Sequence, residues 1–373
     1  MRIAELSAFH PYRGGIAQFG AALHKALAVQ HEVKAFTFTR QYPGFLFPGK
    51  SQFVEADDTA TDVGAVRVLD SVWPLNWGAA ANRIALEKPE LLLTRMWMPF
   101  FGPAMGAVAA RVRRTGAKAI GIVDNAVPHE PRFFDKDFAR YYFKRHNGFI
   151  ALSQAVADDI RALKPDAQVQ VLPHPLYDHF GTRWDRSAAA AHLGVDPALK
   201  TILFFGLIRD YKGLDLLIEA FGQLDGTHQL VIAGEAYGDF APYQRMIDAH
   251  PLRERIHVFQ RFIADAEVPA YFSAADCLVL PYRTATQSGV TAIAFHFGVP
   301  VIATDVGGLA ETVMHERTGL MVPRPDADAI AQGLKTFFEG DRSQRMRDNF
   351  DAVRNELSWA RFADGLVTFA KGL

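Results

Sequence analysis

Strands and helices alternate along nearly the whole chain, and this alternation constrains the fold more than any other feature. Short apolar runs typical of buried strands are followed by segments whose apolar residues recur at helical spacing. Strands are expected at residues 3–9, 33–38, 91–93, 119–123, 149–152, 169–172, 201–205, 229–233, 256–259, 277–280 and 299–304. Because the strands are joined through helices, the pattern predicts α/β architecture with doubly wound parallel sheets and right-handed crossovers.

The expected strands form two groups, separated by residues 173–196, a stretch with prolines and polar residues. A chain of 373 residues is long enough for two domains that each bury a core. We therefore expect a first Rossmann-like domain at residues 1–178, a linker loop, and a second Rossmann-like domain at residues 196–356.

The loop after the strand at 201–205 carries the most informative charges. Gly206, Arg209 and Lys212 lie between this strand and an amphipathic helix. Open α/β sheets bind ligands at the carboxyl ends of their strands, and two fixed cations there suit a phosphate or diphosphate. The nearest acidic residues are Asp210 and Asp215, and an exposed pair with either would contribute only ~0–1 kcal/mol. The alternative is an ordinary surface arginine and lysine.

Two helix starts offer further anion sites. A helix expected from Gly289 to Phe297 would leave the N–H groups of Ser288, Gly289 and Val290 free. Near the N-terminus, Gly14 and Gly15 precede a helix after the first strand. That glycine pair either receives a ligand or forms a tight turn without one.

Taken together, these segments resemble a retaining glycosyltransferase of the GT-B fold, in the group usually called family 4, or glycosyl transferases group 1. The resemblance covers nearly the whole chain, from RGGIAQF through FFGLIRDYKGLDLLIEAF and VIAGE to GVPVIATDVGGLAETVMHERTGLMVP and LSW. It implies two Rossmann-like domains facing across a cleft, with the acceptor on the first and the nucleotide-sugar donor on the second. It also implies that a last helix, about residues 359–373, crosses back to the first domain.

The resemblance assigns roles to particular residues. It implies that Arg209, Lys212 and His129 are catalytic, although a lone histidine such as His129 is equally well explained as a structural hydrogen-bonding residue. The donor-binding residues that it implies are Gly14, Gly15, Gly206, Gly234, Glu235, Phe262, Gln287, Ser288, Gly289 and Val290.

The chain departs from the family pattern at several places. Many members carry two glutamates eight positions apart, and those places hold Ala285 and Ile293. The carboxylate that usually holds the ribose and the one that faces the sugar are therefore both missing. The sequence offers the neutral run Thr286-Gln287-Ser288 instead. Arg209 stands two residues beyond the commonest arginine position, whereas Lys212 matches directly. Family members commonly place a histidine after the strand at 119–123, where this chain has Asp124.

Composition excludes several classes of protein. The 40 basic and 41 acidic residues leave no excess of the kind that nucleic-acid-binding proteins show. A single cysteine, Cys277, excludes a disulfide framework.

No Asp-x-Asp follows a strand and no histidines cluster, so we expect no metal and no cofactor, with a nucleotide diphosphate sugar as co-substrate. No apolar run approaches the ~18 residues of a membrane span, and no cleavable signal pattern opens the chain. A cytoplasmic protein is expected.

The acceptor is expected to be a glycan or a lipid-linked molecule. Aromatic residues gather at 45–47, 97–101 and 133–134, and basic residues lie nearby in sequence at 111–114 and 144–145. Apolar tips beside basic helices would suit peripheral contact with the inner face of the cytoplasmic membrane. The alternative is that these aromatic residues pack in the core of the first domain.

Two rival functions stay open. One is another GT-B enzyme, such as a nucleotide-sugar epimerase or a phosphorylase. The other is a nucleotide-sugar binding protein without turnover, which the missing glutamates suggest. An oxidoreductase is disfavoured, because no strand is followed by G-x-G-x-x-G with an acidic residue ~20 positions later.

Overall fold

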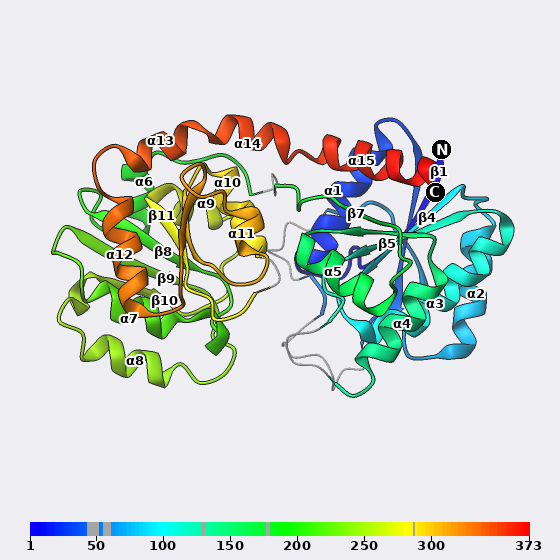
Figure 1. Ribbon diagram of the computed structural model, residues 1–373, viewed down its shortest axis with the longest axis horizontal. Helices are drawn as coiled ribbons and strands as arrows, with labels where there is room; N and C mark the ends of the chain where they lie inside the picture. The colour runs from blue at the N-terminus through cyan, green and yellow to red at the C-terminus, as the bar shows by residue number, and fades with distance from the viewer. Residues whose placement is uncertain (43–51, 55–60, 128–131, 177–179, 286–287) are drawn as a thin grey trace. The chain divides into compact units, whose positions relative to one another are not determined.

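The chain forms two compact units (Figure 1). The computed structural model describes residues 1–42, 52–54, 61–127, 132–176, 180–285 and 288–373. Unit 1 comprises Met1–His174 together with Ser358–Leu373, and unit 2 comprises Pro175–Leu357. Each unit has its own parallel sheet with helices on both faces.

Unit 1 is built on a seven-stranded sheet in the order β3-β2-β1-β4-β5-β6-β7. Its strands are β1 (Arg2–Leu6), β2 (Glu32–Arg40), β3 (Val66–Asp70), β4 (Leu91–Met96), β5 (Lys118–Val123), β6 (Gly148–Ala151) and β7 (Val169–Val171). Its helices are α1 (Gly15–Ala28), α2 (Pro74–Ala85), α3 (Gly102–Val112), α4 (Asp135–Arg145), α5 (Gln154–Leu163) and α15 (Trp359–Gly372).

The two faces of this sheet carry separate cores. Leu91 and Leu93 pack with α1 and the C-terminal helix α15, whereas Leu92 packs with α2, α3 and α5 on the other face. Successive strand residues point to opposite faces, so the unbroken apolar run of β4 is buried on both.

Unit 2 contains a six-stranded sheet in the order β10-β9-β8-β11-β12-β13. Its strands are β8 (Lys200–Phe205), β9 (His228–Ala233), β10 (Ile256–Phe259), β11 (Cys277–Leu280), β12 (Val301–Thr304) and β13 (Gly319–Val322). Helices α7 (Leu214–Phe221), α8 (Ala241–Asp248) and α12 (Ala327–Phe337) pack on one face. The other face carries α6 (Arg186–Leu193), α9 (Val268–Ala274), α10 (Gly289–His296) and α14 (Phe350–Glu356), while α11 (Leu309–Thr312) and α13 (Arg342–Asp348) complete the unit.

The expected doubly wound parallel sheets are confirmed, and every pairing between named strands is parallel. Two strands were not expected from the sequence, β3 and β13, which form an edge of each sheet. β3, with the sequence VRVLD, is only partly buried and carries a weak apolar pattern. β13, with the sequence GLMV, is apolar and mostly buried but only four residues long, which gives little periodicity.

The expectation of a loop throughout residues 173–196 is wrong, because this stretch contains helix α6. Asp185 caps the helix by accepting hydrogen bonds from the backbone N–H groups of Ser187 and Ala188, at 2.9 and 3.0 Å. A run of alanines favours the helix, and Gly194 ends it in a left-handed conformation. Residues 175–195 consequently belong to unit 2, where α6 packs on α9. In the described part of the chain, no helix is long and apolar enough to cross a membrane.

Candidate functional site

The strand order of each sheet reverses at one point, and several predicted site residues, including Arg209 and Lys212, lie in loops at the carboxyl ends of the strands there. In unit 2 the reversal lies between β8 and β11, and in unit 1 between β1 and β4. Loops leave a reversal in opposite directions, which opens a crevice where α/β proteins bind ligands.

Lys212 is a buried cation that has no counter-ion among the described residues. It ends a short 3-10 turn (Asp210–Lys212) after β8, and its side chain is only 9% exposed. Its ammonium Nζ lies 5.4 Å from the ring centre of Tyr282, and no hydrogen bond or ion pair of this ammonium occurs within the described residues. Burial, with a contribution from neighbouring Arg209, lowers the pKa of Lys212. An ammonium held dry in this way would be stabilised by an anionic ligand.

Arg209 is held beside Lys212 and is only partly satisfied. Its guanidinium stacks 4.0 Å from the ring centre of Tyr237, and its Nε atom is buried without a hydrogen-bond partner in the described structure. Stacking on an aromatic ring orients the planar fork while leaving its edge available to a phosphate.

The acidic residues nearest in sequence do not neutralise these cations. The hydroxyl of Tyr243 donates to Asp210 at 3.2 Å. Arg283 holds Asp215 through two hydrogen bonds, of 2.9 and 2.5 Å. In the described structure, Asp215 is paired with Arg283, and neither carboxylate forms an ion pair with Arg209 or Lys212.

Two glycines allow the backbone to close around this point. A Cβ atom on Gly206 would lie 3.5 Å from Nζ of Lys212 and 3.4 Å from Cγ2 of Val290. A Cβ atom on Gly234 would lie 2.0 Å from the carbonyl oxygen of Gly206, so only glycine fits there. The loops after β8, β9 and β11 thus meet around Gly206.

The start of α10 completes the group. This helix begins at Gly289, as expected, and has no acidic residue in its first turn. Ser288 precedes it, with its hydroxyl 3.5 Å from that of Tyr282. Burial raises the pKa of Tyr282 to about 12, so its hydroxyl stays protonated. Free N–H groups, a protonated hydroxyl and two cations together favour an anion of diphosphate type.

The other predicted donor residues differ in how well they are placed. Glu235 is exposed and accepts a backbone hydrogen bond from Ile208 at 2.9 Å, next to the Gly206 loop. Phe262 is 53% exposed beyond β10. Gln287 lies outside the described residues. Ala285 and Ile293, where many family members have glutamates, are each 8% exposed and pack in the apolar core.

In unit 1, a buried ion pair supports the glycine loop. Gly14 has a left-handed φ of 98° and caps α1, which starts at Gly15. Arg95, at the end of β4, donates to both oxygens of Asp124 at 2.7 and 2.6 Å. The same guanidinium lies 3.6 Å over Phe19 and donates to the carbonyl of Ile16 in the first turn of α1 at 3.4 Å. His129, the expected catalytic histidine, lies outside the described residues.

The sequence did not point to Arg95, Tyr237 or Tyr282 as parts of these sites. Tyr237 and Tyr282 each follow a buried strand by a few residues, as Arg209 does, and this position was the available signal. No group of three or more His, Cys, Asp or Glu residues in the described ranges could hold a metal ion.

The expected apolar tips beside basic helices are only partly present. Residues 97–101 pack into the unit 1 core, with Phe101 fully buried and Trp97 donating to the hydroxyl of Tyr42 at 2.8 Å. Phe133 is 97% exposed, but it precedes α4, whereas Lys144 and Arg145 end that helix about 16 Å away. Residues 45–47 lie outside the described ranges. Phe133 and the pair Lys144 and Arg145 therefore lie at opposite ends of α4.

Comparison with known proteins fits this geometry. Residues 199–339, which contain the Lys212 site, match the family model for glycosyl transferases group 1. This part of the chain is similar to group 1 glycosyltransferases. A D-inositol 3-phosphate glycosyltransferase of Mycolicibacterium gilvum is 31% identical over 190 residues, which is 50% of this chain and 42% of that protein. The lipopolysaccharide core biosynthesis mannosyltransferase LpsB of Rhizobium meliloti is 27% identical over 54% of this chain and 58% of its own length. The chain thus aligns with about half the length of these relatives.

Solved structures show the fold. Sucrose-phosphate synthase from Thermosynechococcus elongatus superposes with a TM-score of 0.76 at 19% identity, covering 100% of this chain and 98% of its own. HepE from Anabaena, in complex with UDP and glucose, gives a TM-score of 0.74 at 17% identity, covering 100% of both chains. The fold is GT-B.

Proposed function

We propose that this protein is a glycosyltransferase that moves a sugar from a nucleotide diphosphate sugar to an acceptor hydroxyl, with retention at the anomeric carbon. The observation that carries the proposal is the buried ammonium of Lys212, which has no counter-ion in the described part of the chain and lies beside Arg209 and the start of α10. The match of residues 199–339 to group 1 glycosyltransferases supports the same assignment.

In this reaction the bond between the anomeric carbon and the diphosphate oxygen breaks. Both electrons of that bond go to the diphosphate, which leaves with additional negative charge, while the sugar ring gains positive charge. Arg209 and Lys212 stabilise the departing anion in a site from which water is largely excluded, where fixed charges are most effective. The acceptor hydroxyl bonds to the anomeric carbon, and its proton passes to the leaving phosphate.

We further propose that the transfer is metal-independent and serves the assembly of a glycan or glycolipid. The charge that a metal would neutralise is met by Arg209, Lys212 and the α10 dipole. Relatives named for inositol phosphate and lipopolysaccharide core glycosylation support an acceptor of this class. The complex of HepE with UDP-glucose supports a nucleotide-sugar donor, and on this basis we propose UDP as the donor nucleotide. A lipid-linked acceptor would place the enzyme at the inner face of the cytoplasmic membrane, which stays a prediction.

Nucleotide release from a panel of nucleotide sugars, with and without EDTA, tests this function. Turnover that EDTA leaves unchanged, with a product of the donor's anomeric configuration by NMR, is the expected result. Interconversion of the sugar without acceptor would identify an epimerase. Tight nucleotide-sugar binding without release, with every acceptor class supplied, would identify a binding protein, the reading that Ala285 and Ile293 favour.

A further inference from the structure

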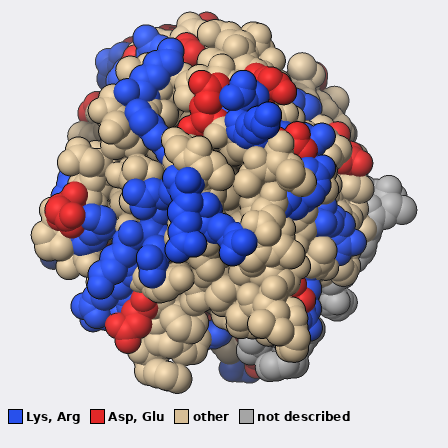
Figure 2. Space-filling view, turned by 90° about the vertical axis from the view of Figure 1, so that its right-hand side faces the viewer, with Lys and Arg blue, Asp and Glu red and all other residues tan. Residues whose placement is uncertain are grey.

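Charge is distributed unequally between the two units. Unit 1 contains 23 Lys and Arg against 17 Asp and Glu, whereas unit 2 contains 17 against 24. Figure 2 shows Lys and Arg gathered in a broad field on the face that lies at the right-hand side of Figure 1. The near-neutral total therefore hides a basic surface on unit 1.

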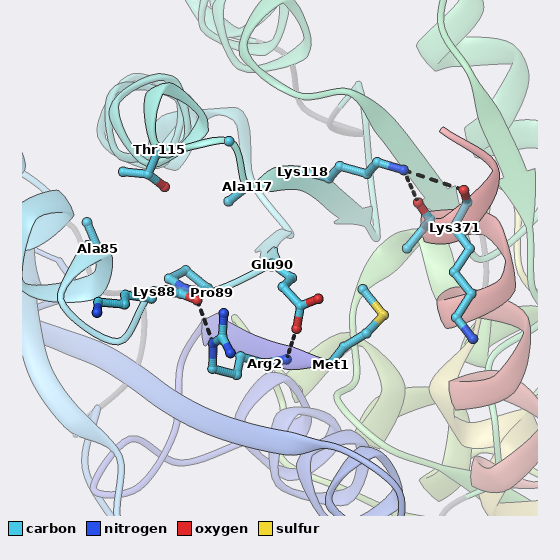
Figure 3. A pocket seen from close by; sticks show the side chains of 12 residues that line it. Met1, Arg2, Ala85, Lys88, Pro89, Glu90, Thr115, Ala117, Lys118 and Lys371 are labelled. Carbon is cyan, nitrogen blue, oxygen red and sulfur yellow. Dashed lines mark hydrogen bonds between the residues drawn. The ribbon is translucent and has the colours of Figure 1, made fainter.

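A pocket of about 760 Å³ lies at the amino edge of the unit 1 sheet, the edge opposite the Gly14 loop. Its walls come from the start of β1, the turn between α2 and β4, the turn before β5, and the end of α15 (Figure 3). Arg2, Lys88, Lys118 and Lys371 line it, and Arg113 and Arg114 belong to the adjoining turn. Glu90 is the one acidic residue among the residues that line this pocket.

Two of the cations are fixed by the backbone. Nε of Arg2 donates to the carbonyl of Lys88 at 2.8 Å, and Nζ of Lys118 donates to the carbonyl of Ala370 at 3.0 Å (Figure 3). Both groups carry additional N–H donors, so these bonds orient the charges without using them up. Lys88 and Lys371 are exposed and form no ion pair within the described residues.

Glu90 does not neutralise the pocket. Its carboxylate accepts a hydrogen bond from the backbone N–H of Arg2 at 2.8 Å, and this bond, with the nearby N-terminal amine, lowers the pKa of Glu90. Glu90 also interacts electrostatically with Arg2, but one carboxylate faces four lining cations, which therefore remain in excess.

Helix dipoles explain only part of this arrangement. Lys371 lies in the last turn of α15, where a cation is favoured by ~0.3–1 kcal/mol. Lys118 is accounted for in the same way, because its Nζ donates to the carbonyls of Ala370 and Lys371 at 3.0 and 3.5 Å in the last turn of α15. Arg2 begins a strand and Lys88 lies in a turn beyond α2, so no helix of which they are part explains these two. Like charges that line one pocket repel one another, and an anion bound there would relieve this repulsion.

We propose that this pocket is a second anion site, which binds the phosphate groups of a multiply charged phosphorylated molecule. The volume falls within the ~300–1,000 Å³ of small-molecule sites, which suits a phosphorylated metabolite or a phospholipid headgroup. The site is separate from the donor site, because it lies in unit 1 and at the amino edge of its sheet.

Titration calorimetry with tripolyphosphate tests the site on the full chain. The double variant Lys88→Gln, Lys371→Gln removes the two cations that have no structural hydrogen bond. Lys34→Gln, Lys335→Gln makes the same change of charge at exposed positions outside the pocket. The donor site is intact in all three proteins and is filled with saturating UDP before each titration, so tripolyphosphate reports the pocket alone. Sugar transfer is expected to stay at the wild-type rate.

The expected result is binding at least about tenfold weaker in the pocket variant than in the control, as the loss of two cation–phosphate contacts predicts. Flotation with vesicles of phosphatidic acid and phosphatidylcholine identifies the source: selective loss of flotation in the pocket variant indicates a lipid headgroup, and selective loss of tripolyphosphate binding alone indicates a soluble ligand. Equal binding of both probes by the pocket and control variants would overturn the proposal.

Discussion

At the scale of the residue, the account depends on a lysine that costs stability in order to bind a ligand. An ammonium without a partner loses its hydration when it is buried, so the folded chain would be more stable without that charge. Functional sites commonly retain such groups at the expense of stability. Replacing Lys212 is therefore expected to lower activity without lowering the stability of the fold.

Replacing Lys212 with methionine keeps the length of the side chain and removes the charge. We expect Lys212→Met to lower transfer by about 10²–10³-fold, as for other single groups that stabilise a developing anion. Its thermal midpoint should equal or exceed that of the wild type. Lys335→Met, at an exposed position of α12, is the matched control and should keep full activity. A lower midpoint combined with retained transfer would contradict the role given to Lys212.

The lowered pKa of Lys212 also predicts how stability changes with pH. Burial holds its pKa below the ordinary value of about 10.4, so between these two values the unfolded chain binds more protons than the folded chain. The free energy of unfolding should therefore rise with pH across this window through Lys212. Urea unfolding of the wild type and of Lys212→Met between pH 7 and 10 isolates this contribution as a difference. The wild type should gain stability relative to the variant as pH rises, and a difference that stays constant would argue against a buried ammonium.

At the scale of the element, the loops after β8, β9 and β11 make the site by close backbone approach. Gly234 is the tightest contact between two of these loops, and its φ of 153° is left-handed. Gly238, in the same connection, has a φ of 116° and open space where a Cβ would be. Comparing alanine variants at Gly234 and Gly238 therefore separates the effect of backbone strain from the effect of the contact with Gly206.

Gly234→Ala should weaken UDP binding and lower the thermal midpoint more than Gly238→Ala does. Both variants carry backbone strain of about 1–3 kcal/mol, but only Gly234→Ala displaces the carbonyl of Gly206. Calorimetric titration with UDP and thermal melts of both variants provide the measurement. Equal effects would mean that the contact between Gly206 and Gly234 does not shape the site.

The helices, strands and loops also show which parts of the structure could be predicted from the sequence alone. The central strands and the positions of Arg209 and Lys212 could be predicted, because apolar runs and the loops after them are local patterns. Helix α6 was not predicted, since eight residues carry little periodicity. The rings of Tyr237 and Tyr282 under the two cations depend on which strands are neighbours, which local patterns do not specify. Phe133 is separated from Lys144 and Arg145 because the length of a helix lies between them. Closeness in sequence alone does not reveal this separation.

At the scale of the whole molecule, the two units present different charges and different sites. Each has its own core, and the sites described in them lie at the carboxyl edges of both sheets, with the basic pocket at the amino edge of one. A bound nucleotide should therefore slow hydrogen exchange in only a few segments of the chain.

Hydrogen exchange with and without UDP maps this footprint. We expect slower exchange at residues 206–213, 234–236 and 288–291 in unit 2, because ligand contact suppresses local opening. The turn at residues 113–118, at the amino edge, should exchange at an unchanged rate. Protection confined to residues 113–118 would place the nucleotide at the wrong edge of the molecule.

The central claim is that Arg209 and Lys212 hold the donor diphosphate, and calorimetric titration of UDP into Arg209→Met and Lys212→Met tests it most directly. Each variant should bind UDP about 10- to 100-fold more weakly than the wild type, since a hydrogen bond to a charged group contributes ~1.5–3 kcal/mol. Uridine, which lacks the diphosphate, should bind all three proteins alike. Wild-type affinity for UDP in both variants would contradict the account and the placement of the donor site in unit 2.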